Sequence, residues 1–300
     1  MVSRLSAKSE EETKEVHKPS KATALSVAWR KLKKSRLSVV GGGVVLFSLM
    51  VAVLAPIIAP YELKQEFYGE QMLPPSTKFW FGTDSGGKDV FSWVVWGART
   101  SLYVGFASVL IEILIGCSIG MIAGYFGGII DEILMRITDV VLTLPTLMLL
   151  ILAVSMFQVR SINIIIMVMG GLGWPFMARV VRSEFLSLRE STFVEAARSM
   201  GASSWRIILR HILPNTLPTL IILVTIDIPG YIFWESALTF LGFGDPLSAS
   251  WGVLIDKGTD LLLPAPWITA FPGLALFFTS LGFNLFGDGL RDALDVKTRA

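Results

Sequence analysis

The stretch from Arg179 to Asn215 reads RVVRSEFLSLRESTFVEAARSMGASSWRIILRHILPN, and long apolar stretches precede and follow it. It carries too many charged residues to cross a bilayer, yet its first half has apolar residues at helical spacing. These residues are Phe185, Leu188, Phe193, Ala196 and Ala197. Gly201 then interrupts the pattern, as expected where a tight turn needs a positive φ. We therefore predict two short helices joined by a glycine turn, and we call this stretch the polar hairpin.

The second helix of the polar hairpin is predicted over Ala202 to Arg210. Ser203 and Ser204 suit its N-cap, because their hydroxyl groups can accept hydrogen bonds from free backbone N–H groups there. Pro214 is expected to end the helix, since proline lacks an N–H and clashes with the preceding turn. The expected apolar face consists of Trp205, Ile208 and Leu209.

The stretches on both sides of the polar hairpin are apolar and long. Of the 300 residues, 53% are hydrophobic and 17% are charged, whereas soluble domains have about 25% charged residues. A helix needs roughly 20 apolar residues to cross a bilayer. The predicted fold is all-α, a polytopic membrane protein with six transmembrane helices. The predicted spans cover about 39–59, 101–125, 133–157, 162–178, 217–241 and 268–286.

The distribution of Lys and Arg predicts how the chain is oriented in the membrane. If the N-terminus is cytoplasmic, 20 of the 26 Lys and Arg residues fall in cytoplasmic segments and 6 fall outside. This bias predicts that both termini and the polar hairpin are cytoplasmic.

The predicted domain organisation follows from these spans. Residues 1–37 are expected to form a cytoplasmic tail and a juxtamembrane amphipathic helix, and residues 38–300 form one membrane domain. The polar, mixed-charge residues 1–21 are typical of a disordered tail rather than a cleavable signal peptide. External loops are expected over about 60–100 and 242–267, and the hairpin loop over about 179–215.

The polar hairpin resembles the EAA loop of ABC importer permeases. The resemblance rests on Glu195-Ala196-Ala197, on Gly201 after three further residues, and on Leu213-Pro214. It implies that the two short helices are coupling helices, which dock on a cytoplasmic ATPase and transmit its motion. The family pattern has an isoleucine where this chain has His211, and RHILPN is similar to the dipeptide/oligopeptide branch. The implied coupling residues are Glu195, Ala196, Ala197, Arg198, Gly201, His211 and Pro214.

Other stretches resemble the same branch, among them FWFGTDSGGKDVF at 79–91 and FNLFGDGLRDALD at 283–295. The resemblance covers nearly the whole chain and is closest to the second, C-type permease subunit. It implies a type I importer permease fold in a prokaryotic cell membrane, surrounded by lipid. The implied partners are a second homologous permease, two cytoplasmic ATPases and an external substrate-binding protein. The resemblance further implies that ATP and Mg bind to the ATPases and that this chain binds no cofactor.

Several ionisable residues fall inside the predicted spans, where they are costly and ask for an explanation. Glu112 lies within the second span, and Asp139 can pair with Arg136 one turn before it. Three further residues recur at i, i+4 and i+8 on one face of the fifth span. We hypothesise that this face borders the translocation path, and the alternative is hydrogen bonding that only holds the bundle together. The three residues are Asp227, Tyr231 and Glu235.

Small residues and tryptophans give two further expectations. Gly116, Gly120 and Gly124 recur at spacing four, which is typical of closely packed membrane helices. Four tryptophans are expected near the external membrane interface as amphipathic anchors. They are Trp93, Trp96, Trp251 and Trp267.

Several function classes are excluded or left open. The sequence has no phosphate-binding loop and no metalloprotease or serine-hydrolase motif, so we expect a non-catalytic subunit. It has no basic stripe with aromatic residues, so no nucleic-acid partner is expected. A self-sufficient secondary transporter would show inverted repeats, which are not evident, and a membrane enzyme would show clustered His, Asp and Glu. The substrate stays open among peptides, oligosaccharides and nickel.

Overall fold

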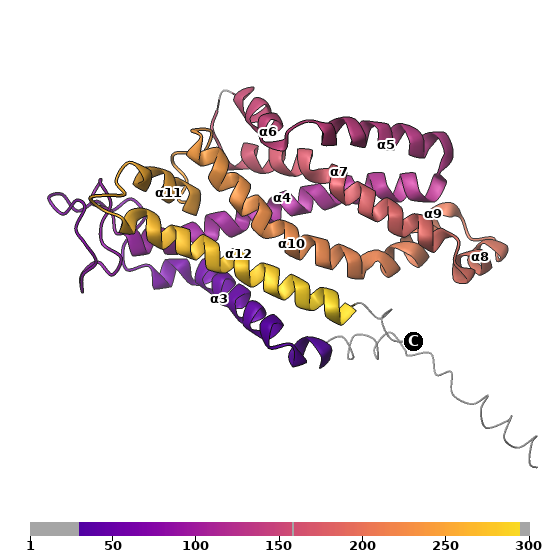
Figure 1. The fold of residues 1–300 in the computed structure, drawn as a ribbon, viewed down its shortest axis with the longest axis horizontal. Coiled ribbons are helices and arrows are strands. Elements are labelled where there is room, and N and C mark those ends of the chain that lie inside the picture. Colours follow the sequence, from indigo (N-terminus) through magenta and orange to yellow (C-terminus); the bar gives the residue numbers. More distant parts are fainter. Residues whose placement is uncertain (1–29, 158, 295–300) are drawn as a thin grey trace, which may run out of the picture.

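The structure, a computed structural model, describes residues 30–157 and 159–294. Its regular elements within these ranges are all helices, which confirms the all-α prediction (Figure 1). The predicted tail over residues 1–21 lies outside the described residues. Of the juxtamembrane stretch, residues 30–34 are helical and are followed by Ser35, which N-caps the first long helix.

The long helices run side by side through the bundle (Figure 1). In the described residues, five helices are long and apolar enough to cross a membrane. The elements are α3 (Arg36–Ile58), α4 (Val90–Phe126), α5 (Gly128–Thr143), α6 (Thr146–Ser155), α7 (Ile162–Arg189), α8 (Thr192–Ser199), α9 (Ser204–Ile207), the π-helical turn η1 (Ile208–Ile212), α10 (Leu213–Phe240), α11 (Trp251–Thr259) and α12 (Trp267–Leu294).

The third predicted span is not one straight helix. It consists of α5 and α6, which are bent by 89° relative to each other. Leu144 adopts an extended backbone between them, with φ −86° and ψ 138°, as is typical of a residue before proline. Pro145 then provides no N–H for continuing the ladder of α5. The described part therefore has five candidate spans, or six if this bent pair crosses the membrane as one.

The centre of the bundle is the pair formed by α4 and α7, which pack together more extensively than any other two elements. Their close approach depends on glycine. A Cβ added at Gly120 would lie 2.6 Å from the Ala178 carbonyl oxygen, and one at Gly124 would lie 2.6 Å from Phe185 Cβ. Gly116 faces Met177 in the same way. The close packing predicted from the glycine spacing is thus confirmed.

Two ion pairs join α5 to α7. Arg182 donates to both carboxylate oxygens of Asp131, with Nη2 at 2.6 Å from Oδ2. Asp139 pairs with Arg179 of α7, so the predicted pairing with Arg136 is wrong. The reason is tertiary, because α7 runs alongside α5 and presents guanidinium groups that a local i, i+3 rule does not anticipate.

The tryptophans predicted to lie near the external interface are mostly packing residues. The indole N–H groups of Trp93, Trp251 and Trp267 donate to the backbone carbonyls of Leu63, Val94 and Thr83, at 2.9–3.1 Å. Trp93 and Trp251 are only 6% and 2% exposed. Trp93 and Trp267 are thus held by the segment between α3 and α4, and Trp251 packs against α4; their role as interface anchors stays a prediction.

Candidate functional sites: a membrane cavity and the polar hairpin

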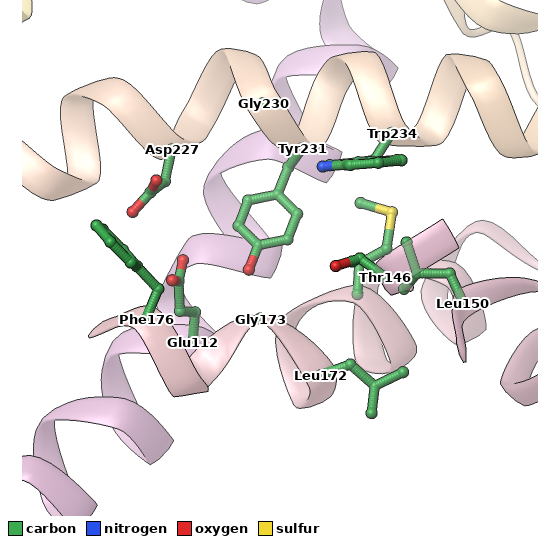
Figure 2. A pocket seen from close by; sticks show the side chains of 11 residues that line it. Glu112, Thr146, Leu150, Leu172, Gly173, Phe176, Asp227, Gly230, Tyr231 and Trp234 are labelled. Atoms are coloured by element: carbon green, nitrogen blue, oxygen red, sulfur yellow. The ribbon is translucent and has the colours of Figure 1, made fainter. Parts of the chain in front are cut away.

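A cavity of about 230 Å³ lies where the middles of α4, α7 and α10 meet the start of α6. Neither α3 nor α12 contributes to its lining. Figure 2 shows the carboxyl groups of Glu112 and Asp227 at one end, beside Phe176, and Trp234, Thr146 and Leu150 at the other. The lining residues are Glu112, Thr146, Leu150, Met169, Leu172, Gly173, Phe176, Asp227, Gly230, Tyr231 and Trp234.

Two carboxyl groups and a hydroxyl group face the same part of the cavity. Glu112 comes from α4, and Asp227 and Tyr231 come from α10 one turn apart (Figure 2). Glu112 is only 3% exposed. Its Oε2 and the Oδ2 of Asp227 are buried atoms without a hydrogen-bond partner. The structure thus brings together Asp227 and Tyr231, as the helical spacing predicts, and it adds Glu112.

Glu235, the third residue of the predicted path face, lies elsewhere. It is 0% exposed and does not line the cavity. The Ser250 hydroxyl donates to its Oε1 at 2.7 Å, and the Thr239 hydroxyl at 3.1 Å. Because Ser250 also N-caps α11, Glu235 joins α10 to the start of α11. In this structure it is a packing residue, which matches the alternative left open by the sequence.

Gly173 makes room for Tyr231. A Cβ added at Gly173 would overlap the Tyr231 hydroxyl oxygen, whereas one added at Gly171 would meet nothing within 4 Å. We expect Gly173→Ala to displace the tyrosine, at a cost of about 1–3 kcal/mol, and to lower substrate uptake several-fold. Gly171→Ala on the same helix should leave uptake unchanged. Uptake assays in cells carrying either variant check this, and equal activity of the two variants would contradict it.

The polar hairpin forms at the end of the bundle opposite α11 (Figure 1). Within it, α8 and α9 are joined by a turn in which Gly201 has φ +80°. The Gly201 N–H donates to the Arg198 carbonyl at 2.9 Å. Ser203 holds the N-cap position of α9, although its side chain makes no capping hydrogen bond. The predicted short first helix and the positive-φ glycine turn are confirmed, whereas the second helix is not short.

Pro214 does not end the second helix, so that prediction is wrong. Residues from Ser204 to Phe240 form one continuous helix of 37 residues. It contains the π-helical turn η1, in which the Leu213 N–H donates to the Ile208 carbonyl five residues earlier. Such a turn relaxes the ladder just before Pro214, whose ring and missing N–H a regular α-helix does not accommodate.

The buried face of α9 and η1 differs from the predicted one. Ile207, Ile208 and Ile212 are at most 1% exposed, whereas Trp205 and Leu209 are each 55% exposed. The buried side chains join a cluster from α7 and α8 that includes Phe185, Val194 and Ala197. Only Ile208 of the predicted apolar face is buried. The hairpin is thus anchored by isoleucines, and it leaves large apolar side chains exposed.

The residues predicted to couple to an ATPase divide into exposed and buried positions. Glu195, Ala196, Arg198 and Gly201 are exposed, and Ala197 is 2% exposed. Glu195 and Arg198 line a recess together with Tyr125, Arg189 and Glu190. His211 lines a second recess with Arg206 and Arg210. Pro214 lies at the start of α10 and is half-buried.

Comparison with known proteins places the chain in a family. Residues 116–300 match the family model described as binding-protein-dependent transport system inner membrane component. The chain belongs to this family. Residues 23–75 match a second model, the N-terminal transmembrane domain of oligopeptide transport permease C. The chain is therefore a multi-pass membrane permease component and not the catalytic subunit, as the sequence predicts.

Individual relatives agree with the family. The dipeptide transport system permease protein DppC of Bacillus subtilis (strain 168) is 42% identical over 274 residues, which cover 91% of this chain and 85% of the relative. The glutathione transport system permease protein GsiD of Pectobacterium atrosepticum is 38% identical, covering 91% of each chain. The oligopeptide transport system permease protein OppC of B. subtilis is 37% identical, covering 91% of this chain and 89% of that one. The predicted resemblance to dipeptide and oligopeptide permeases is confirmed.

A solved structure shares the fold. It is an inward-facing conformation of the MetNI methionine ABC transporter, with a TM-score of 0.55 and 21% identity. The match covers 67% of this chain and 96% of that chain.

Sequence reasoning noted Glu112 but did not connect it with Asp227 and Tyr231. The signal that could have identified Glu112 as a site residue was its position inside a predicted span, where ionisable residues are costly. The connection itself depends on how α4 packs on α10, which no local pattern in either helix encodes.

Proposed function

We propose that this chain is one of two permease subunits of an ATP-driven importer and forms half of the translocation pathway for di- or oligopeptides. The observation that carries this proposal is the 42% identity with a dipeptide permease over 91% of the chain. The relatives described above are named for dipeptide, oligopeptide and glutathione transport, all of them peptides. This favours peptides over oligosaccharides and nickel.

The polar hairpin is the element that receives motion from the ATPase. Glu195 and Arg198 are exposed on α8, and a docked helix pair biases a two-state membrane domain through contacts that differ between its states. Gly201 sets the turn, and Ala197 is buried in the cluster that anchors α8. Partner ATPases bind ATP and Mg, and this chain binds no cofactor. An external substrate-binding protein delivers the peptide.

The proposed membrane arrangement has both termini in the cytoplasm and six spans, with the bent α5–α6 pair as the third. It is supported by the excess of Lys and Arg in the tail and in the polar hairpin. Residues 38–300 form the permease domain. The loops over about 60–100 and 242–267 face outward, and lipid surrounds the exposed apolar faces.

The translocation path runs past the cavity of Glu112, Asp227 and Tyr231. Support comes from its position at the middle of three long helices and from its two unpartnered carboxylate oxygens, because ionisable residues at membrane depth mark transport pathways. The second permease completes the wall that this chain leaves open.

Co-purification tests the proposal. The tagged chain, extracted from native membranes, is expected to bring down a second permease and two ATPases that contain phosphate-binding loops. A self-sufficient secondary transporter would purify without them. Purification of this chain alone, with ion-driven transport in liposomes, would overturn the proposal.

A further inference from the structure

We propose that the cavity of Glu112, Asp227 and Tyr231 binds a primary ammonium group, namely the free α-amino group of the peptide in transit. The inference rests on the proposed function, which it makes more specific. The membrane domain itself would then take part in substrate recognition, in addition to any external binding protein.

The first argument is the missing countercharge. Glu112 is only 3% exposed, and its Oε2 has no hydrogen-bond partner; Figure 2 shows its carboxyl group on the same side as the carboxyl group of Asp227 and the hydroxyl group of Tyr231. The Oδ2 of Asp227 is likewise unpartnered. No Lys, Arg or His is among the described residues that line the cavity. Buried carboxylates are costly unless a proton or a cation neutralises them, and a positively charged guest would supply the cation that this lining lacks.

The second argument is the match between donors and acceptors. An ammonium group carries three N–H donors and no acceptor. The cavity offers the two unpartnered carboxylate oxygens and the hydroxyl oxygen of Tyr231, which faces them in Figure 2. The lining also includes the aromatic rings of Tyr231, Trp234 and Phe176, and aromatic faces attract organic cations. Hard divalent cations such as Ca²⁺ and Mg²⁺ instead take six or more oxygen ligands.

The third argument is size. A volume of about 230 Å³ corresponds to roughly eight water molecules at about 30 Å³ each. This holds the amino end of a peptide and its first side chain, but not an extended oligopeptide. The lining also includes the apolar side chains of Leu150, Met169 and Leu172, which suit that first side chain. The cavity is thus a subsite for one end of the substrate, and the remainder extends toward the second permease.

Chemical protection tests binding without requiring transport. The whole complex, in lipid nanodiscs without binding protein, is treated with dicyclohexylcarbodiimide, a hydrophobic reagent for buried carboxyl groups. Labelling of Glu112 and Asp227 is followed by mass spectrometry. Alanyl-alanine is expected to slow labelling of both by about tenfold, and N-acetyl-alanyl-alanine, which lacks the ammonium group, is expected to have no effect. Equal protection by the acetylated peptide, or protection by sodium chloride alone, overturns the inference.

Variants give a second readout in proteoliposomes. Glu112→Gln and Asp227→Asn should each lower ATP-driven uptake of alanyl-alanine by about tenfold or more. Asp288→Asn, an exposed carboxylate on α12, should transport at the wild-type rate. Wild-type uptake by both cavity variants overturns the inference and leaves the proposed function standing. If the wild-type complex imports no peptide, the proposed function fails, and the protection experiment still decides whether the cavity binds ammonium.

Discussion

Gly120→Ile is expected to prevent α4 and α7 from packing and to reduce the folded chain in the membrane to a small fraction of the wild-type level. A Cβ at this position would lie 2.6 Å from the Ala178 carbonyl oxygen and 2.7 Å from Val181 Cβ. The first contact is with backbone, which cannot rotate away. We expect a cost above about 3 kcal/mol, the upper end of ordinary overpacking. The free energy of unfolding of a native protein is about 5–15 kcal/mol, so a cost of this size removes a large part of the stability.

The control for this variant is Gly43→Ile. Gly43 lies within α3, and a Cβ added there would meet nothing within 4 Å. Both variants place the same β-branched side chain inside an apolar helix, so they differ only in what surrounds it. Immunoblots of membranes and thermal unfolding in detergent measure the difference. Similar amounts and similar unfolding temperatures for the two variants would show that the α4–α7 contact is not the centre of the fold.

Gly201→Val is expected to leave the complex assembled but to uncouple ATP hydrolysis from import. Gly201 has φ +80° and nothing lies within 4 Å of an added Cβ, so the cost is in the backbone and not in a clash. A residue with a Cβ loses about 1–2 kcal/mol in this conformation, and a β-branched residue loses more. The turn then populates other geometries, and α8 leaves its position against α9. The amount of peptide imported per ATP hydrolysed should fall by about tenfold. A conformational cost of about 1.4 kcal/mol changes the population of the native turn by that factor.

Gly201→Asn is the matched variant, because asparagine adopts positive φ more readily than other residues with a side chain. It should keep most of the coupling. The two variants are compared in proteoliposomes by measuring uptake and ATP hydrolysis together. Full coupling with valine, or equal loss with asparagine and valine, would show that the backbone conformation of this turn does not matter.

The parts of the fold that sequence predicts correctly depend on local signals. Apolar runs of sufficient length give the helices, and the break at Gly201 gives the turn because only glycine adopts a positive φ without cost. The glycine repeat in α4 predicts close packing, because small residues let helix backbones approach. Each of these signals lies within one segment.

The parts that sequence misses depend on how a segment responds to its surroundings. A proline inside an apolar run is compatible with an end, a kink or a relaxed turn. Pro145 takes part in an 89° bend, whereas Pro214 follows a π-helical turn and the helix continues. Hydropathy shows how long an apolar run is, but it does not show whether the helix bends or continues at the proline.

The candidate site shows the same division. Spacing by four places Asp227 and Tyr231 on one face, and both line the cavity. Spacing by eight adds Glu235, which lies about 12 Å further along the helix axis. There the neighbour is the start of α11 and not the cavity. Glu112 joins the site only through the packing of α4 against α10.

The most direct test of the account is the energy source of uptake. The complex of this chain, a second permease, two ATPases and an external binding protein is placed in proteoliposomes, and uptake of labelled alanyl-alanine is followed. We expect uptake only when ATP is present on the ATPase side and the binding protein on the other. Uptake by this chain alone, driven by an ion gradient without ATP, would contradict the central claim.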